Sequence, residues 1–312
     1  MNITDPSTIT ASFFCPVCAH DALRFSSADD AHSALVCSKC AKAFPIRDDI
    51  IEFIDARTLD EFKAKELEGN MKTYSANPSG QLQKGSWTYY HRKNADRIFS
   101  RLSRLMRGTI SDTIVSLGSG AAWEVEELLR FPELQSVRTI YSSDIALAAT
   151  RLVAQRFAAY DVNLVLFTSD LDHCPLKLTQ YPVLIFEALH HTPDMHRTIE
   201  SLLAAGYAHV YFCEPTENFI MRGFQKLGLS RRVEYSGVTP DRLSIQRLLD
   251  IAKRHGYAST IDTLWILPED YFRRMFGKIR AENLCIRFTE LLSRITKPFM
   301  PGNYSAVHLR KI

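Results

Sequence analysis

Four of the seven cysteines have the spacing of a metal site. Cys15 and Cys18 form one Cys-x-x-Cys pair, and after 18 further residues Cys37 and Cys40 form a second. Each pair presents two thiolates from one tight turn, and two such turns complete a tetrahedral zinc site with no open coordination position. A redox Cys-x-x-Cys would need no second pair at this distance, and no β-α-β pattern surrounds either pair. The spacing therefore predicts a structural zinc ion and no metal catalysis.

The second stretch that could carry chemistry is VSLGSGAAWE, residues 115–124. A β-branched apolar run ends at Gly118, the chain turns to Gly120, and a helix-like acidic stretch follows. Trp123 stands where a dinucleotide-binding turn needs a small residue, and no Gly-Lys-Ser/Thr follows, so neither a pyrophosphate nor a P-loop phosphate is favoured. Glu124 would also repel a phosphate, but it could accept hydrogen bonds from a cationic amino-acid ligand. S-adenosylmethionine is such a ligand, with an ammonium, a sulfonium and no phosphate.

The elements around this turn alternate between strand-like and helical patterns. Five apolar runs, at residues 113–118, 137–144, 163–170, 183–188 and 209–215, are separated by helical stretches. This alternation predicts an α/β fold with a doubly wound, mostly parallel sheet. Two further runs, at residues 258–266 and 305–312, bring the expected number to seven strands, with the last two adjacent and antiparallel.

The pattern divides the chain into three parts. Residues 1–57 are predicted to form a zinc-ribbon domain, residues 58–84 a linker, and residues 85–312 the α/β domain. Residues 74–87 are rich in turn formers and are expected to be a loop, and a helix with regularly spaced apolar residues is expected to end at Gly108. An aromatic and basic insertion is expected at about residues 268–301, where it could bundle as a lid, lie on an anionic membrane or follow a phosphate backbone.

The order of these motifs resembles the class I S-adenosylmethionine-dependent methyltransferases over about residues 85–312. VSLGSGAAWE is similar to the glycine-rich first motif of that family, with Ser116 in place of the usual acidic residue and Ala122 in place of the third glycine. Glu124 could take over part of the missing polar contact. The stretch AKAFPIRDDIIEFID resembles the end of short zinc ribbons that accompany methyltransferase domains, over about residues 13–55.

The resemblance implies a set of cofactor-binding residues. Gly118 and Gly120 would form the turn, and Asp144, at the end of the second strand, would bind the ribose hydroxyls. In TSDLDHCPL, Asp170 would lie near the adenine amine and Leu171 against the ring. Asp144 taken alone could equally be a helix N-cap.

The resemblance also places candidate catalytic residues in FEALHHTPD. Glu187, His190 and His191 would lie beside the methyl-transfer centre, and Glu214, in YFCEPT, at the crevice. A histidine suits a general base that takes a proton from an oxygen or nitrogen acceptor. One of the two histidines could instead be structural, and Glu214 could cap a helix.

Composition and charge bound the remaining possibilities. The chain has 46% hydrophobic and 23% charged residues, as globular proteins do, and no apolar run long enough to cross a membrane. Its start lacks the pattern of a secretory signal, so the expected location is cytoplasmic. Residues 1–219 carry a net charge of −6, whereas residues 220–312 carry +9, which hints at an anionic partner.

Three functions are consistent with these features. The first is methylation of a small molecule or of a lipid- or sugar-linked metabolite, at oxygen or nitrogen. The second is methylation of RNA with the ribbon helping to hold the substrate, although residues 13–55 contain four basic residues against seven acidic ones. The third is a binding module that has kept the fold and lost turnover, as the changes at Ser116 and Ala122 suggest.

Overall fold

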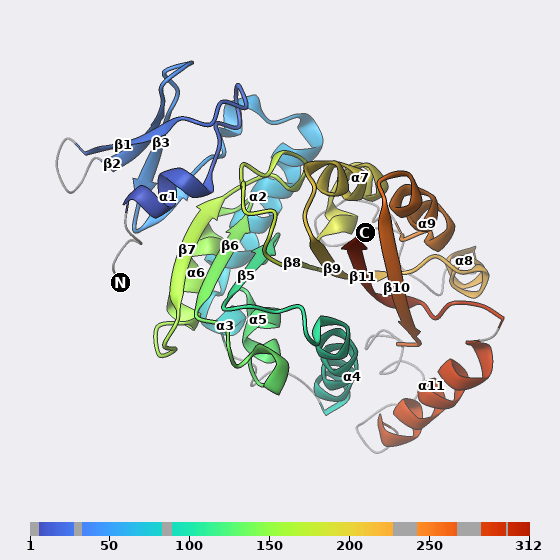
Figure 1. Cartoon of the computed structure of the whole chain (residues 1–312). Coiled ribbons are helices and arrows are strands. Elements are labelled where there is room, and N and C mark those ends of the chain that lie inside the picture. Colours follow the sequence, from blue (N-terminus) through green and yellow to red (C-terminus); the bar gives the residue numbers. More distant parts are fainter. Residues whose placement is uncertain (1–5, 28–32, 83–88, 227–241, 267–281, 298) are drawn as a thin grey trace.

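A computed structural model gives the fold of the chain (Figure 1). It describes residues 6–27, 33–82, 89–226, 242–266, 282–297 and 299–312. Within these ranges, none of the helices combines the length and apolar character that crossing a bilayer requires. The first part of the predicted insertion, up to residue 281, lies outside the described residues.

The sheet contains the seven strands that the sequence predicts. Five of them are parallel, in the order β7, β6, β5, β8, β9, and β11 and β10 follow as an antiparallel edge. The strands are short and apolar, and the central β5 and β8 are buried along their whole length. Their bounds are β5 Thr113–Leu117, β6 Thr139–Asp144, β7 Asn163–Thr168, β8 Val183–Phe186, β9 His209–Pro215, β10 Tyr257–Leu264 and β11 Tyr304–Lys311.

The expectation of a separate seven-stranded sheet is wrong, because four N-terminal strands extend the sheet to eleven. These are β1 (Leu23–Ser27), β2 (Ser33–Cys37), β3 (Ala43–Arg47) and β4 (Ile50–Glu52), paired antiparallel in that order. β4 then pairs in parallel with β7. An unpaired edge strand exposes backbone donors and acceptors, and β4 covers the edge of β7 along Leu166–Thr168.

Helices cover both faces of the sheet (Figure 1). On one face α7 (Met195–Ala205) and α9 (Ile245–Arg254) share a core with the N-terminal strands. On the other face α4 (Tyr89–Met106), α5 (Trp123–Leu128) and α6 (Leu147–Arg156) form a second core. Successive residues of β5 alternate between these cores, with Ile114 in the second and Val115 in the first, as expected for a strand between two helical layers.

Two helices occupy most of the predicted linker. α2 (Glu61–Ala76) begins at the N-cap Asp60, which accepts a hydrogen bond from the Lys63 amide, and α3 (Pro78–Leu82) follows. Both helices contact α6. The loop expected at residues 74–87 is therefore helical where these helices cross it. The buried side chains of α2 are Lys63 and Glu66, so the helix lacks an apolar face that its sequence would reveal.

The remaining helices lie near the chain ends and after β9. α1 (Pro6–Ser12) precedes the first cysteine pair, and α8 (Phe219–Lys226) follows β9. α11 (Glu282–Thr296) falls within the predicted insertion and contacts α4 and β10.

Candidate active site and zinc-ribbon cysteine cluster

The glycine turn lies where β5 meets α5. Gly118 and Gly120 have φ of 62° and 51°, in the left-handed region that glycine tolerates. The Gly120 amide donates a hydrogen bond of 2.9 Å to Asp144 Oδ2, and the Ala146 amide donates one of 2.9 Å to Oδ1. The neighbours of β5 are β6 and β8, and chain order reverses there, so the turn lies at the crevice where α/β sheets bind ligands. The structure thus brings Gly118, Gly120 and Asp144 together.

Ala122 completes this turn in a conformation that glycine usually adopts. Its φ is 52°, and it is the N-cap of α5. A left-handed alanine costs roughly 1 kcal/mol because its Cβ approaches the carbonyl oxygen. The chain keeps the geometry of the missing third glycine at that cost.

Glu124 points into the protein under the turn. The Ser116 hydroxyl donates a hydrogen bond of 2.9 Å to Glu124 Oε1, and both side chains are buried. Burial raises the pKa of Glu124 to about 7, against the lowering effect of the Ser116 hydrogen bond. Glu124 thus places a carboxyl group beside Ser116, the position at which the resembled motif usually has an acidic residue.

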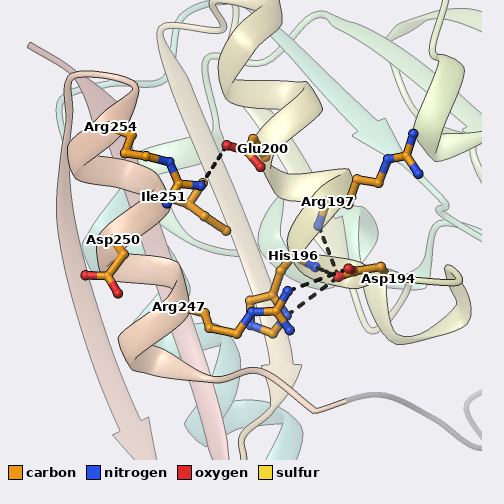
Figure 2. A pocket seen from close by; sticks show the side chains of 8 residues that line it. All are labelled: Asp194, His196, Arg197, Glu200, Arg247, Asp250, Ile251 and Arg254. Atoms are coloured by element: carbon orange, nitrogen blue, oxygen red, sulfur yellow. Dashed lines mark hydrogen bonds and ion pairs between the residues drawn. The ribbon is translucent and has the colours of Figure 1, made fainter.

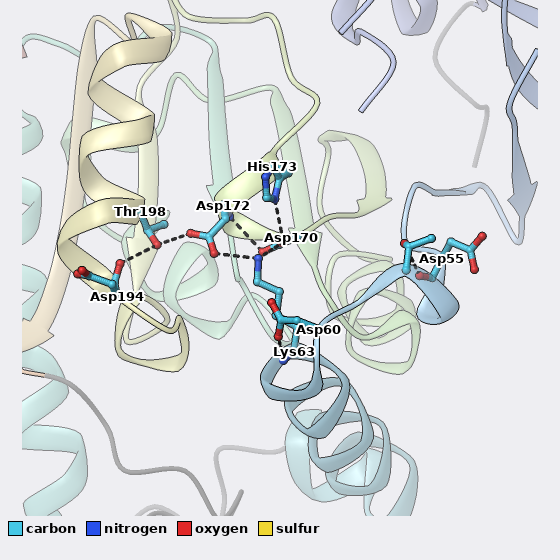
Figure 3. Close-up of polar contacts among 9 residues, drawn as sticks. Asp55, Asp60, Lys63, Asp170, Asp172, His173, Asp194 and Thr198 are labelled. Atoms are coloured by element: carbon cyan, nitrogen blue, oxygen red, sulfur yellow. Dashed lines mark hydrogen bonds and ion pairs between the residues drawn. The ribbon is translucent and has the colours of Figure 1, made fainter. Parts of the chain in front are cut away.

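Asp170 lies in a charged network that joins three elements (Figure 3). It caps the 3-10 helix η4 (Leu171–His173), and it forms an ion pair with Lys63 of α2. Lys63 Nζ also lies 2.8 Å from Asp172 Oδ2, and Asp172 accepts a hydrogen bond from Thr198 of α7. The predicted adenine-side acid is therefore held by a lysine from the predicted linker.

Apolar and aromatic side chains lie close to both glycines of the turn. A Cβ on Gly118 would come within 2.6 Å of Ala188 Cβ and 3.2 Å of Leu171 Cδ1. A Cβ on Gly120 would come within 2.3 Å of the Tyr74 hydroxyl of α2. Leu171 thus lies against the turn, and Tyr74, which the sequence does not single out, lies against its other glycine.

His190 and Glu214 form a buried pair at the ends of β8 and β9. Their Nδ1 and Oε2 atoms are 2.6 Å apart, and both side chains are almost fully buried. Glu214 Oε1 accepts hydrogen bonds of 2.9 Å and 2.7 Å from the amides of Ala188 and Leu189. Glu214 therefore holds the turn after β8 and orients the imidazole of His190.

His191 is the more accessible of the two histidines. Its side chain is 26% exposed, and its Nδ1 lies 3.1 Å from Glu66 Oε2 of α2. The rings of His190 and His191 lie 4.3 Å apart between centroids. Glu66 has no motif in the sequence, and only the position of α2 reveals it beside His191.

Glu187 directly follows β8 and has a strained backbone conformation. Its φ is 50°, which is costly for a residue with a side chain, and such strain often occurs at functional sites. The side chain is exposed, yet desolvation by surrounding protein raises its pKa above the usual value, while nearby His190 lowers it.

The four cysteines lie together with the geometry of a metal site. Their sulfur atoms are all within 4.8 Å of one another, and the Cys15–Cys40 and Cys18–Cys37 pairs are each separated by 3.6 Å. A tetrahedron with Zn–S bonds of about 2.3 Å has sulfur atoms about 3.8 Å apart. The cluster therefore fits zinc.

A shallow groove of about 420 Å³ lies between α7 and α9 (Figure 2). Arginine and acidic side chains line it and pair with one another, including Arg254 with Glu200 at 2.7 Å and Arg247 with Asp194 at 3.6 Å. None of the predicted site residues lines this groove. We therefore do not take it as the candidate active site.

No protein-family model and no curated protein matches the chain. Among solved structures, magnesium protoporphyrin IX methyltransferase from Synechocystis PCC 6803 with bound SAH is similar, with a TM-score of 0.51 and 13% identity over 80% of this chain and all of that one. A possible histamine N-methyltransferase from Thermotoga maritima has a TM-score of 0.48 and 9% identity, over 78% of this chain and 98% of that one. The likeness to the Synechocystis enzyme, together with the strand order, shows that the chain has the class I methyltransferase fold.

Proposed function

We propose that the protein is an S-adenosylmethionine-dependent methyltransferase. The observation that carries this proposal is the hydrogen bond between the Gly120 amide and Asp144, which joins the glycine turn to the acid of the next strand at the sheet's switch point. The donor set fits the cofactor, because a glycine turn with a carboxylate beside it offers partners for an amino acid and a ribose. S-adenosylmethionine would supply a methyl group bonded to a positively charged sulfur, and loss of that methyl group would leave the sulfur as a neutral thioether.

The hydrogen bonds of Asp144 and Glu124 guide the assignment of the cofactor residues. Asp144 keeps lone pairs beyond its two amide bonds, so it can accept the ribose hydroxyls. Leu171 would lie against the adenine and Asp170 would accept from its amine. Glu124, which faces Ser116 in the interior, would act by holding the turn rather than by touching the cofactor.

We assign the base to His191. Methyl transfer depends mainly on alignment of the acceptor with the methyl group, and a base adds to the rate when the acceptor must lose a proton. His191 is accessible and Glu66 orients it, so it would take that proton. His190, buried against Glu214, would position the neighbouring turn, and Glu187 would face the acceptor.

A small or lipid-linked acceptor is favoured over RNA. Of the four basic residues in the ribbon region, Lys42 lies 3.0 Å from Asp55 and Arg47 lies 3.5 Å from Glu52. Paired cations of this kind release few counterions and contribute little to binding a phosphate backbone. The zinc ion would be structural.

Calorimetry with S-adenosylmethionine tests the proposal. Binding in the micromolar range is expected, and Asp144→Ala should weaken it by about ten- to one-hundred-fold, as loss of hydrogen bonds to a charged group does. Asp161→Ala, an exposed acid at the opposite end of β7, is the control and should bind normally. Binding of NADH in place of S-adenosylmethionine would overturn the assignment.

A further inference from the structure

Helix α11 carries an exposed apolar stripe. Leu284, Phe288, Leu291 and Ile295 are between 54% and 66% exposed, and their spacing of four, three and four residues places them in one row. The other side of α11 faces the protein: Thr289 is fully buried, and the Ser293 hydroxyl accepts a hydrogen bond from the Trp265 amide. Phe299, just beyond the helix, is 86% exposed. Burying such a row would be favourable, so its exposure indicates a binding surface.

The charges beside the stripe are basic. Arg287 and Arg294 are exposed and follow Leu284 and Leu291 by three residues, so they border the stripe along one side. Glu290, the acidic residue between them, lies 3.9 Å from Arg97 of α4 and so turns toward the protein. The whole segment 220–312 carries a net charge of +9. An apolar row with a cationic border is the pattern of a helix that lies on an anionic bilayer.

The position of α11 relates this stripe to the candidate active site. α11 connects the end of β10 with the start of β11, where Tyr304 pairs with Pro215 at the carboxyl end of β9. This is the edge at which Glu187, Glu214 and the glycine turn lie. Figure 1 shows α11 at the periphery of the molecule, beside α4.

We propose that α11 docks the protein on an anionic lipid surface, so that the methyl acceptor is an amphipathic molecule held in that surface. The docking rests on the stripe and its charges, whereas the nature of the acceptor also rests on the proposed methyltransferase function. A second copy of the chain is a poorer occupant, because antiparallel isologous packing of two stripes would bring the arginine rows of both copies together.

Sedimentation with lipid vesicles tests the docking. The full chain is expected to sediment with vesicles of phosphatidylcholine and phosphatidylglycerol and to remain in solution with phosphatidylcholine alone. Phe288→Ser/Leu291→Ser should weaken binding to the anionic vesicles by at least about tenfold, and Arg287→Gln/Arg294→Gln by about tenfold. Leu249→Ser, which removes an exposed apolar residue from α9, is the matched control and should bind as the wild type does.

The outcomes separate the docking from the enzymatic function. Absence of binding to anionic vesicles, or unchanged binding of both double variants, would overturn the docking. The docking would also be overturned if the wild type formed a dimer, or bound RNA in a salt-sensitive way, and Phe288→Ser/Leu291→Ser abolished that association. Calorimetry with S-adenosylhomocysteine is run on every variant. Unchanged affinity there shows that the variants are folded, and failure of the wild type to bind it would contradict the methyltransferase proposal alone.

Discussion

At the scale of single residues, Ser116 and Glu124 show how the glycine turn tolerates a changed sequence. Ser116 cannot supply a carboxylate, and Glu124 brings one back from the first turn of α5 with a hydrogen bond of 2.9 Å. The carboxyl group is buried, which raises its pKa to about 7 from an ordinary 4.5. The turn thus contains an acid that titrates near neutral pH.

Glu124 should make stability depend on pH. Because the pKa of Glu124 is higher in the folded protein than in the unfolded chain, ionisation of this group opposes folding. The contribution of Glu124 to the free energy of unfolding should therefore be largest below about pH 4.5 and fall as the pH rises toward 7. Glu124→Gln keeps an acceptor for Ser116 without the charge, so it should remove this loss, on the order of 3 kcal/mol. Urea unfolding at pH 5 and pH 8 measures the effect, with Asp161→Asn as control. An equal pH dependence in the wild type and Glu124→Gln would refute it.

His191 should affect turnover rather than cofactor binding. His191→Ala should lower kcat by about 10²- to 10⁴-fold if the acceptor loses its proton to this residue, with unchanged affinity for S-adenosylmethionine. Glu66→Gln should lower kcat less, since it removes only the group that orients the ring. His255→Ala, at the C-cap of α9 next to Glu200, serves as the control. Full activity of His191→Ala would assign the base elsewhere.

At the scale of elements, α2 links the parts of the candidate site. It places Lys63 between Asp170 and Asp172, Glu66 beside His191, and Tyr74 against Gly120. A helix that buries charged side chains is stable only where oppositely charged groups pair with them. α2 therefore contributes residues to the candidate site.

Lys63→Ala should destabilise the protein by about 3 kcal/mol, since it leaves Asp170 and Asp172 as neighbouring like charges with little exposure. Lys65→Ala is the matched control on the same helix: Lys65 is exposed and pairs with the exposed Glu61 at 2.7 Å, so its loss should cost less than about 0.5 kcal/mol. Equilibrium unfolding in urea compares the two variants. Equal stability of both would show that the buried ion pairs do not stabilise α2.

At the scale of the whole molecule, the ribbon region and the α/β sheet share one core. Phe13 lies 5.2 Å from Phe53 and 5.0 Å from Phe167 between ring centroids, and all three are buried. The Phe14 amide donates a hydrogen bond of 2.9 Å to the Pro175 carbonyl, and the Ile54 amide donates one of 3.2 Å to Thr168. The cysteine cluster is thus joined to the segment that begins at the end of β7 and contains Asp170 and Leu171.

Removal of zinc should therefore weaken cofactor binding as well as lower stability. From the sequence alone, Cys15→Ser is expected to lower stability without abolishing cofactor binding, because the α/β domain would have its own core. The shared core instead predicts a drop in S-adenosylhomocysteine affinity of about tenfold or more after chelation, with recovery on adding zinc. Calorimetry on chelated and zinc-restored protein measures this, with circular dichroism to show that the chelated protein is folded. Full affinity of a folded, zinc-free protein would show that the two regions are uncoupled.

The sequence by itself determined the features that depend on local spacing. The four cysteines, the glycine turn and the alternation of strands and helices are written in residues close along the chain, and the strand-end positions of Asp144, Glu187 and Glu214 follow from them. The apolar runs at residues 258–266 and 305–312 also predicted the last two strands, which pair antiparallel at the sheet edge as expected.

Only the tertiary structure decided how distant segments meet. The pairing of β4 with β7 depends on a free strand edge, which no local pattern marks. The different roles proposed for His190 and His191 depend on which glutamate lies beside each ring, Glu214 for His190 and Glu66 for His191. The position of α2 could not be predicted from a periodic pattern of apolar residues, because the buried side chains of this helix are charged. Their partners lie more than one hundred positions away along the chain.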